Sequence, residues 1–226
     1  MLRITGGAFD MGDEKTKRHK VTVGDFWIDK YPVTQSLYHK VMGDNPSSFK
    51  GDDKPVENVT WFDAVNFCNK LSGSMALDPV YKLEGYKLEM IEGAQGFRLC
   101  TEAEWEYACR GGTKGGRYGN IDEIAWYDKN SGDATQGVGQ KKPNQYGLYD
   151  MLGNVWEWVE DDWHENYNDA PDDGSAWIDK PRGSDRVMRG GSWSGFAQYC
   201  RSAYRNDCPP DYRDFILGFR LSRSLP

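Results

Sequence analysis

The chain has 226 residues, which is long for one small domain and short for two, so we expect a single domain over residues 1–226. Its net charge of −7 argues against binding to nucleic acid, which requires clustered Lys and Arg. No stretch is long and apolar enough to span a membrane, so we expect no direct membrane span in this chain.

The composition favours an irregular fold with an aromatic core. Hydrophobic residues make up only 38% of the chain, yet 9 Trp, 13 Tyr and 9 Phe can each bury a large area. The 26 Gly and 10 Pro are spread along the sequence and predict many turns and short elements. We therefore predict an α+β domain rather than a helical bundle.

The first third of the chain predicts short strands followed by two helices. Residues 4–9 and 21–23 flank a polar turn and predict a hairpin, and residues 26–28 predict the next strand. Thr34 is placed to cap a helix that runs to about Met42. Thr60 is placed in the same way to cap a second helix over residues 61–71.

The middle of the chain predicts one strand pair and one well-marked helix. Residues 80–83 and 87–91 predict two strands joined through Glu84-Gly85. Thr101 and Glu104 form a capping box that begins a helix ending at Gly111-Gly112. Residues 112–144 are polar and Gly-rich, which predicts a loop.

The last third combines strand-like stretches with a segment that has no period. Residues 147–158 pack aromatic side chains between glycines. Residues 186–193 and 217–221 alternate apolar and polar side chains, as paired strands do. The segment between these last two stretches follows neither a strand nor a helix period, so we do not expect it to be a core element. Trp156, Trp158 and Trp193 are expected in the core, and the three histidines are expected to face solvent.

The cysteines do not form a covalent or zinc-binding framework. Their number is odd and none are spaced as C-x-x-C, so neither disulfides nor a zinc site is indicated. Cys68 and Cys109 lie on apolar helical faces, where we expect buried thiols. The five cysteines are Cys68, Cys100, Cys109, Cys200 and Cys208.

A series of motifs in a fixed order resembles the formylglycine-generating-enzyme, or sulfatase-modifying-factor, family. The motifs are Phe9-x-Met11-Gly12, Tyr31-Pro32-Val33-Thr34, Pro55-Val56-x-x-Val59-Thr60-Trp61, Arg98-Leu99-x-Thr101-Glu102-Ala103-Glu104-Trp105-Glu106-Tyr107-Ala108, Gly153-Asn154-Val155-Trp156-Glu157-Trp158, Arg189-Gly190-Gly191-Ser192-Trp193 and Gly218-Phe219-Arg220. The resemblance covers nearly the whole chain. It implies the family's variant of the C-type lectin fold, an irregular α+β domain with few helices and short twisted strands.

The resemblance also indicates what is missing for catalysis. The family's enzymes oxidise a substrate cysteine with two copper-binding thiols that follow the Gly-Gly-Ser strand. The corresponding positions here are Gly195 and Cys200, so at most one of the two thiolates is kept. We therefore predict that the chain is not an enzyme, has no catalytic residues and needs no cofactor.

The ending is more similar to the variable proteins of diversity-generating retroelements, in particular those of treponemes. In that group the catalytic cysteines are lost and a reverse transcriptase rewrites chosen codons near the end of the gene. The shared landmarks here are Arg189-Gly190-Gly191-Ser192-Trp193, Arg201-Ser202-Ala203, Arg213 and Gly218-Phe219-Arg220-Leu221. An Asn codon randomised at its two adenines cannot give Lys, Glu, Gln, Met or Trp, and the candidate variable positions comply, whereas Gln198 does not.

This resemblance implies a variable ligand-binding region over about residues 186–226. Irregular, Tyr-rich loops with small polar neighbours have the composition of antibody paratopes. The predicted ligand-binding residues are Ser194, Gly195, Phe196, Tyr199, Tyr204, Asp207, Cys208, Pro209, Asp211, Tyr212, Asp214 and Phe215.

A second set of residues in the same region is assigned to the supporting scaffold. The arginines could form an anionic ligand site or hold the loops in place, and their positions within the motifs favour the scaffold. The predicted scaffold residues are Arg189, Trp193, Arg201, Arg205, Arg213 and Arg220. The resemblance further implies a calcium-binding turn at Gly153, Val155 and Glu157, for which the favoured alternative is an ion pair between Glu157 and an arginine.

Three functions remain open at this point. The first is a receptor-like or adhesin-like variable protein that binds an unidentified protein or surface ligand. It would lie at the cell surface or face the periplasm, with a lipid anchor on a leader that this chain lacks. The second is a copper-dependent thiol oxidase, and the third is a domain that binds one fixed partner.

Overall fold

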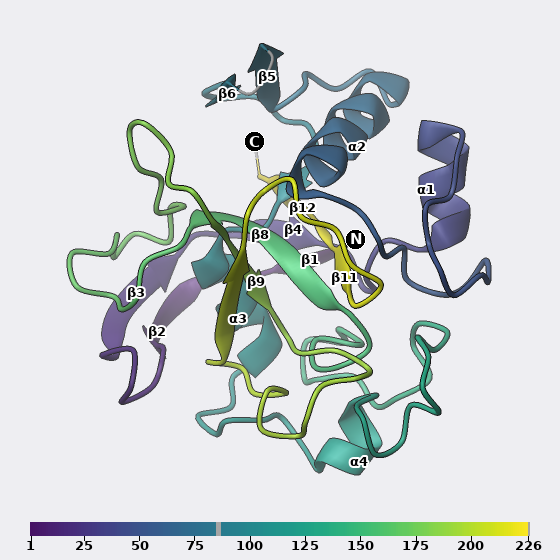
Figure 1. Ribbon diagram of the computed structural model, residues 1–226. Coiled ribbons are helices and arrows are strands. Elements are labelled where there is room, and N and C mark those ends of the chain that lie inside the picture. The colour runs from purple at the N-terminus through teal and green to yellow at the C-terminus, as the bar shows by residue number, and fades with distance from the viewer. Residues whose placement is uncertain (85–86, 226) are drawn as a thin grey trace.

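The computed structural model describes residues 1–84 and 87–225, and it contains two four-stranded sheets and two separate hairpins (Figure 1). The first sheet has the order β1-β4-β12-β7 and the second has the order β10-β9-β8-β11. The strands are β1 (Leu2–Ile4), β2 (Gly7–Met11), β3 (His19–Val23), β4 (Phe26–Ile28), β5 (Tyr81–Glu84), β6 (Lys87–Met90), β7 (Arg98–Leu99), β8 (Trp156–Asp162), β9 (Arg186–Arg189), β10 (Arg205–Cys208), β11 (Leu217–Phe219) and β12 (Leu221–Ser224).

The helices begin where the sequence places their caps. The helices are α1 (Gln35–Met42), α2 (Trp61–Ser74), α3 (Glu102–Arg110) and α4 (Ile121–Ile124). The capping box of Thr101 and Glu104 is formed, and Gly111 ends α3 with a left-handed φ of 52°. Helix α2 extends three residues past the predicted end at Leu71, and α4 is a short helix inside a segment predicted as loop.

The N-terminal hairpin differs from the prediction at its first strand. Ile4 belongs to β1, which pairs with β4, whereas β2 pairs with β3. The chain changes direction at Gly6, where a Cβ atom would lie 2.1 Å from the Val23 carbonyl oxygen, so no side chain fits. The predicted strand pair is formed by β5 and β6, although Gly85, at its expected turn, lies outside the described residues.

The two ends of the chain meet in the first sheet. Strand β12 lies between β4 and β7 and is antiparallel to both, so residues 221–224 close the sheet that residues 2–4 begin. Strand β11 immediately precedes β12 but is parallel to β8 in the second sheet. The short step from β11 to β12 therefore joins the two sheets, and Arg220 lies at this step.

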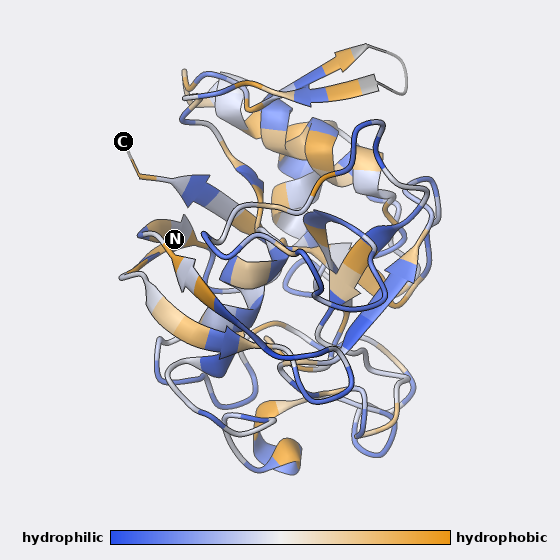
Figure 2. Cartoon of the chain, turned by 90° about the vertical axis from the view of Figure 1, so that its left-hand side faces the viewer, coloured by the Kyte–Doolittle hydropathy of each residue, from blue (hydrophilic) through white to orange (hydrophobic). Residues whose placement is uncertain are grey.

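The core consists of two apolar clusters, and large aromatic side chains fill much of both. Trp156, Trp158 and Trp193 are 4%, 1% and 8% exposed, which confirms their predicted core positions. Cys68 and Cys109 are fully buried, as predicted. Apolar residues lie mostly on strands and helices in Figure 2, whereas the long loops between them are largely hydrophilic. Within the described residues, no helix is both long enough and apolar enough to cross a bilayer.

The prediction that all three histidines face solvent is wrong for two of them. His39 is exposed. His19 packs against the Tyr167 ring at a centroid distance of 4.8 Å, and both of its ring nitrogens are buried without a hydrogen-bond partner among the described residues. His164 stacks on Trp177 with the ring centroids 3.6 Å apart. Long loops fold back over these two rings, and the sequence gives no sign of that contact.

Candidate ligand-binding surface

The segment between β9 and β11 leaves the second sheet through two glycines. Gly190 and Gly191 have φ angles of 104° and 80°, which side chains disfavour. A Cβ atom on Gly191 would lie 2.9 Å from the Cys200 sulfur, so the loop packs directly on that thiol. The segment returns to the sheet as β10, which is antiparallel to β9, and then continues as a loop to β11. Its two ends are thus fixed by pairing with neighbouring strands.

Within residues 1–84 and 87–225, this segment carries the exposed large aromatic side chains. Seven large hydrophobic side chains are exposed among the described residues, and the only aromatic ones are Phe196, Tyr212 and Phe215. Their exposed fractions are 60%, 42% and 45%. The other four, three methionines and one isoleucine, lie outside the segment. Exposure of rings is therefore concentrated where the sequence predicts ligand contacts.

The remaining predicted contact residues are exposed or half-buried. Tyr199, Tyr204 and Cys208 pack partly against the core. The Phe196, Tyr199 and Tyr204 rings form a continuous row, with successive centroids 6.0 and 5.0 Å apart. Ser194, Pro209 and Asp211 are exposed, and Gly195, Asp207 and Asp214 are half-buried. The predicted contact rings therefore do not all face solvent: Phe196 is exposed, whereas Tyr199 and Tyr204 are half-buried.

A second aromatic cluster adds a residue that sequence reasoning missed. Phe49 lies 5.2 Å from the Trp193 ring and 6.1 Å from the Phe215 ring, measured between centroids. The Trp193 indole nitrogen donates to the Phe215 carbonyl oxygen at 3.2 Å, which ties that loop to the core. Phe49 lies about 150 positions earlier in the chain and has no motif around it, so only the fold brings it here.

Buried ion pairs hold the backbone beneath the exposed rings. Arg189 is fully buried and donates to Glu102 at 3.1 Å, to Glu106 at 2.5 Å and to the Ser202 carbonyl at 2.6 Å. Arg205 donates to both oxygens of Glu102 at 2.5 and 2.8 Å. Both carboxylates come from α3, so these two arginines fix the segment to that helix. Burial by itself would raise the pKa of Glu102, but Arg205 and Arg189 more than offset this and lower it.

A third buried arginine performs the same task at the junction of the two sheets. Arg220 is 1% exposed and donates to Glu157 at 2.9 Å, to the Asp29 carbonyl at 2.9 Å and to the Tyr149 carbonyl at 2.8 Å. The Trp105 indole nitrogen donates to Glu157 as well, at 2.7 Å. One guanidinium therefore joins β8, the end of β4 and a loop.

The other two arginines assigned to the scaffold lie at the surface. The Arg201 side chain is 32% exposed and lies 3.3 Å from an Asp13 oxygen. The Arg213 side chain is 54% exposed and lies 3.5 Å from an Asp63 oxygen. Exposed pairs of this kind contribute little to stability because water screens the charges. The five arginines thus divide into three buried anchors and two surface cations.

The two positions that carry thiols in the related oxidases do not form a thiol pair. Gly195 takes the first position. Cys200 takes the second, is fully buried, and burial raises the pKa of its thiol to about 12. The thiolate, which binds metal and attacks substrates, is therefore strongly disfavoured. Among the described residues, no group of three His, Cys, Asp or Glu side chains is arranged to hold a metal ion.

The one carboxylate of the predicted calcium-binding turn, Glu157, is already engaged by other side chains. Both carboxylate oxygens of Glu157 already accept hydrogen bonds, from the Arg220 guanidinium and from the Trp105 indole. A calcium ion bound by Gly153, Val155 and Glu157 would have to compete with a buried cation for the same oxygens. The arrangement matches the alternative stated above, an ion pair between Glu157 and an arginine.

Sequence comparison places the chain among known relatives. Residues 1–225 match the sulfatase-modifying factor enzyme 1-like domain. The chain is 36% identical to the chaperone protein LppX of Paenibacillus barcinonensis, over 99% of this chain and 89% of that protein. It is 32% identical to the cattle formylglycine-generating enzyme over 89% of this chain, but it spans only 52% of that enzyme's length.

Structural comparison identifies the same fold in two solved structures. Treponema denticola variable protein 1 has a TM-score of 0.91 and 37% identity, covering 99% of this chain and 94% of that one. PvdO from Pseudomonas aeruginosa has a TM-score of 0.83 and 30% identity, covering 99% and 93%. The predicted α+β, C-type lectin fold of the formylglycine-generating-enzyme type is confirmed, as is the resemblance to the variable proteins.

Proposed function

This chain belongs to the sulfatase-modifying factor enzyme 1-like domain family, and we propose that within it the chain is a non-catalytic, ligand-binding variable protein. Its binding surface is the segment from about residue 186 to residue 226, and a diversity-generating retroelement changes the exposed side chains. The ligand is a protein or another surface molecule. The chain acts at the cell surface or on the periplasmic side, held by a lipid anchor.

One observation carries the proposal: exposed aromatic rings sit on a backbone that buried ion pairs hold. Phe196, Tyr212 and Phe215 are exposed, whereas Arg189, Arg205 and Arg220 of the same C-terminal segment are buried and paired. Side chains in such positions can change without disturbing the charges that fix the loops. Aromatic anchors of this kind typically contribute about 2 kcal/mol or more each to binding when they enter a pocket on the partner.

Two further observations support a binding role over thiol oxidation. Gly195 removes one of the two thiols that the oxidases use, and Cys200 is buried with its pKa raised to about 12. The high TM-score to the Treponema denticola variable protein extends over nearly the full length of both chains.

The genome around the gene provides the first test. A retroelement predicts a neighbouring reverse transcriptase gene and a near-copy of the sequence that encodes the C-terminal segment, differing from it only at adenines. Sibling strains should differ at Phe196, Tyr212 and Phe215 but not at Arg189, Arg205 or Arg220. If the locus has neither the gene nor the near-copy and the strains are identical, the surface binds one fixed partner.

A copper titration provides the second test. We expect no stoichiometric Cu(I) binding to the reduced protein, and a Cys200→Ser variant should behave in the same way as the parent. Tight binding of one Cu(I) that the Cys200→Ser variant loses would instead favour the oxidase.

Protease treatment of intact cells tests the proposed location, because a surface-displayed chain is digested without lysis.

A further inference from the structure

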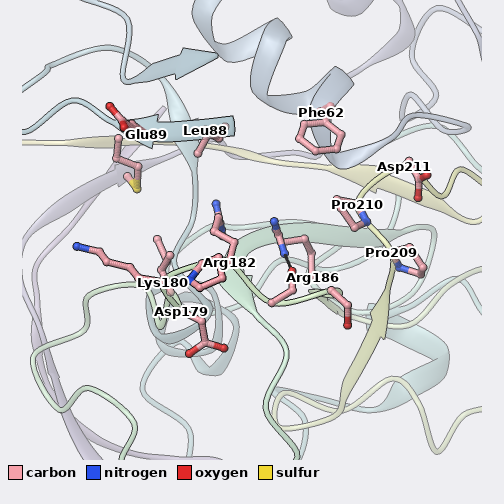
Figure 3. Close-up of a pocket in the computed structure, with 15 residues that line it drawn as sticks. Phe62, Leu88, Glu89, Asp179, Lys180, Arg182, Arg186, Pro209, Pro210 and Asp211 are labelled. Atoms are coloured by element: carbon pink, nitrogen blue, oxygen red, sulfur yellow. Dashed lines mark hydrogen bonds between the residues drawn. The ribbon is translucent and has the colours of Figure 1, made fainter. Parts of the chain in front are cut away.

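A large pocket lies beside the variable surface and is built mostly from residues outside it. It has a volume of about 1090 Å³, at the upper end of the range of small-molecule sites. Its lining comes from four places: α2 and β6, the loop over residues 178–184, Arg186 at the start of β9, and the loop that follows β10 (Figure 3). Pro209 and Asp211 are shared with the predicted variable positions, whereas the other lining residues are not.

The walls of this pocket are largely apolar. Phe62 of α2 and Leu88 of β6 lie on one side in Figure 3, and Pro209 and Pro210 lie at one end. Ile178 contributes from the loop below. Walls of this composition favour a ligand with an apolar body, because water leaves both surfaces when they meet.

Two arginines form the centre of the pocket. The Arg182 and Arg186 guanidinium groups lie over the Trp61 ring, 4.8 and 5.0 Å from its centroid. Arg182 is fully paired, since it donates to Asp162 at 3.0 Å and to Glu160 at 2.9 Å. Stacking on the buried indole fixes both planar groups in place.

Arg186 is incompletely paired although it is 4% exposed. Its Nη1 atom lies 2.9 Å from Asp162 and donates to the Gly183 carbonyl at 2.7 Å, but its Nε atom has no hydrogen-bond partner among the described residues. Burial and the neighbouring Arg182 lower the pKa of Arg186, so its charge is under-compensated. An unpaired buried donor carries a free-energy cost that a ligand acceptor would remove.

The rim adds one further cation and three acids. Lys180 is exposed at the left of the pocket in Figure 3. Asp179 beside it is engaged by the His164 ring at 3.2 Å. Glu89 and Asp211 are exposed at the two ends, where water screens their charges. Glu160 and Asp162 balance the charges of Arg182 and Arg186 at the centre, so the unused hydrogen-bonding capacity of Arg186, rather than a net positive charge, favours a carboxylate there. The acids at the rim select against ligands with several negative charges.

From this arrangement we propose that the pocket is a binding site for an apolar organic monocarboxylate. The carboxylate accepts hydrogen bonds from the Arg186 guanidinium, and the apolar body lies between Phe62, Leu88 and the proline pair. Either a free organic acid or the C-terminal residue of a peptide offers this chemistry. Of the residues assigned to this ligand, only Pro209 is a predicted variable position, so the site goes beyond the function proposed above.

Isothermal titration calorimetry of the full chain with N-acetyl-L-phenylalanine, at low salt, tests the proposal. The matched neutral probe is N-acetyl-L-phenylalaninamide, which differs only at the carboxylate. We expect the acid to bind roughly ten-fold or more tightly than the amide, the effect of one charged hydrogen bond. Equal affinities, or no binding of the acid, overturn the proposal.

Three variants locate the site. Arg186→Gln should weaken binding of the acid about ten-fold and leave the amide unchanged. Leu88→Trp fills the apolar part and should abolish binding of both probes. Lys180→Glu should weaken the acid a few-fold through charge alone, whereas Lys129→Glu makes the same charge change at an exposed position outside the pocket lining and should have no effect.

The outcomes separate this proposal from the previous one. If Arg186→Gln does not fold, Leu88→Trp and Lys180→Glu still test the location of the site. If both of these variants bind the acid as the parent does, the acid does not bind in this pocket. A short peptide ending in Phe that binds more tightly than N-acetyl-L-phenylalanine identifies a chain end as the source, and equal affinity identifies a free acid. Phe196→Ser lies outside the pocket lining and should leave acid binding unchanged even if it removes the ligand of the variable surface.

Discussion

The last third of the chain contains two regions that are interleaved in sequence but opposite in character. The anchor set, Arg189, Arg205 and Arg220, is buried and bonded to carboxylates of α3 and β8. The display set, Phe196, Tyr212 and Phe215, is exposed on the loops between β9, β10 and β11. This difference indicates that exposed side chains can be substituted without loss of the fold, because buried groups that they do not contact hold the backbone in place.

The largest expected effect is on stability when an anchor is removed. Arg189→Leu removes three buried hydrogen bonds, to Glu102, Glu106 and the Ser202 carbonyl, although Arg205 and Arg110 still pair with the two carboxylates. We expect a loss of roughly 3–5 kcal/mol in the free energy of unfolding. Urea unfolding followed by fluorescence measures it. Arg213→Leu is the matched control because that side chain is 54% exposed, and it should change stability by less than about 0.5 kcal/mol. Equal effects of the two variants would remove the distinction between anchors and surface cations.

The second effect is on the pH dependence of stability. Burial raises the pKa of Asp150, which lies close to the buried Arg220, to about 6 in the folded protein. The pKa of Asp150 is higher in the folded protein than in the unfolded chain, so the protonated carboxyl stabilises the folded state below about pH 4. That contribution, about 3 kcal/mol, is lost as the pH rises from about 4 to 6.

Asp150→Asn tests this directly. The variant should be more stable than the parent above pH 6, and the two should converge below pH 4, in urea titrations at several pH values. Asp211→Asn, on the exposed loop, serves as the control and should follow the parent throughout. If the stability curves of the parent and Asp150→Asn are parallel, the buried carboxyl does not cause a loss of stability between pH 4 and 6.

The third effect concerns the display set. The combined variant Phe196→Ser, Tyr212→Ser and Phe215→Ser should lose the affinity that the rings supply, on the order of 2 kcal/mol for each ring that acts as an anchor. Its free energy of unfolding should fall by no more than about 1.5 kcal/mol, since exposed substitutions usually cost less than about 0.5 kcal/mol each. Phe215 is expected to contribute most of this loss because its ring contacts Phe49 and Trp193. Unfolding of the variant at room temperature would show that the rings are structural.

The smallest effect is on the thiols. Cys200 is buried and its pKa is raised to about 12, and that of Cys208, which is half-buried, is raised to about 11. At pH 8 we expect iodoacetamide to leave Cys200 unmodified and to alkylate Cys208 slowly, as measured by mass spectrometry of the native protein. Rapid alkylation of Cys200 would indicate an accessible, reactive thiol, as an oxidase needs.

The sequence by itself determined the fold, the starts of three helices and the longer lists of candidate residues from which both sets come. Capping at Thr34, Thr60 and Thr101 is a local signal, carried by a hydroxyl and the backbone within one turn, so it can be read without the fold. The loss of one catalytic thiol at Gly195 is equally direct. That the segment between β9 and β11 is diversified and contacts a ligand remains a prediction from the sequence.

Only the tertiary structure decided which arginines are anchors, which residues join the surface and where the pocket lies. All five arginines stand in similar motif contexts, but burial depends on carboxylates from α3 and β8 that lie 63 to 103 positions away. Phe49 joins the aromatic cluster, and Arg186 meets Trp61, through the same long-range packing. Such contacts have no periodic or local signature, because their energy depends on desolvation and on the distance between elements, which the fold alone sets.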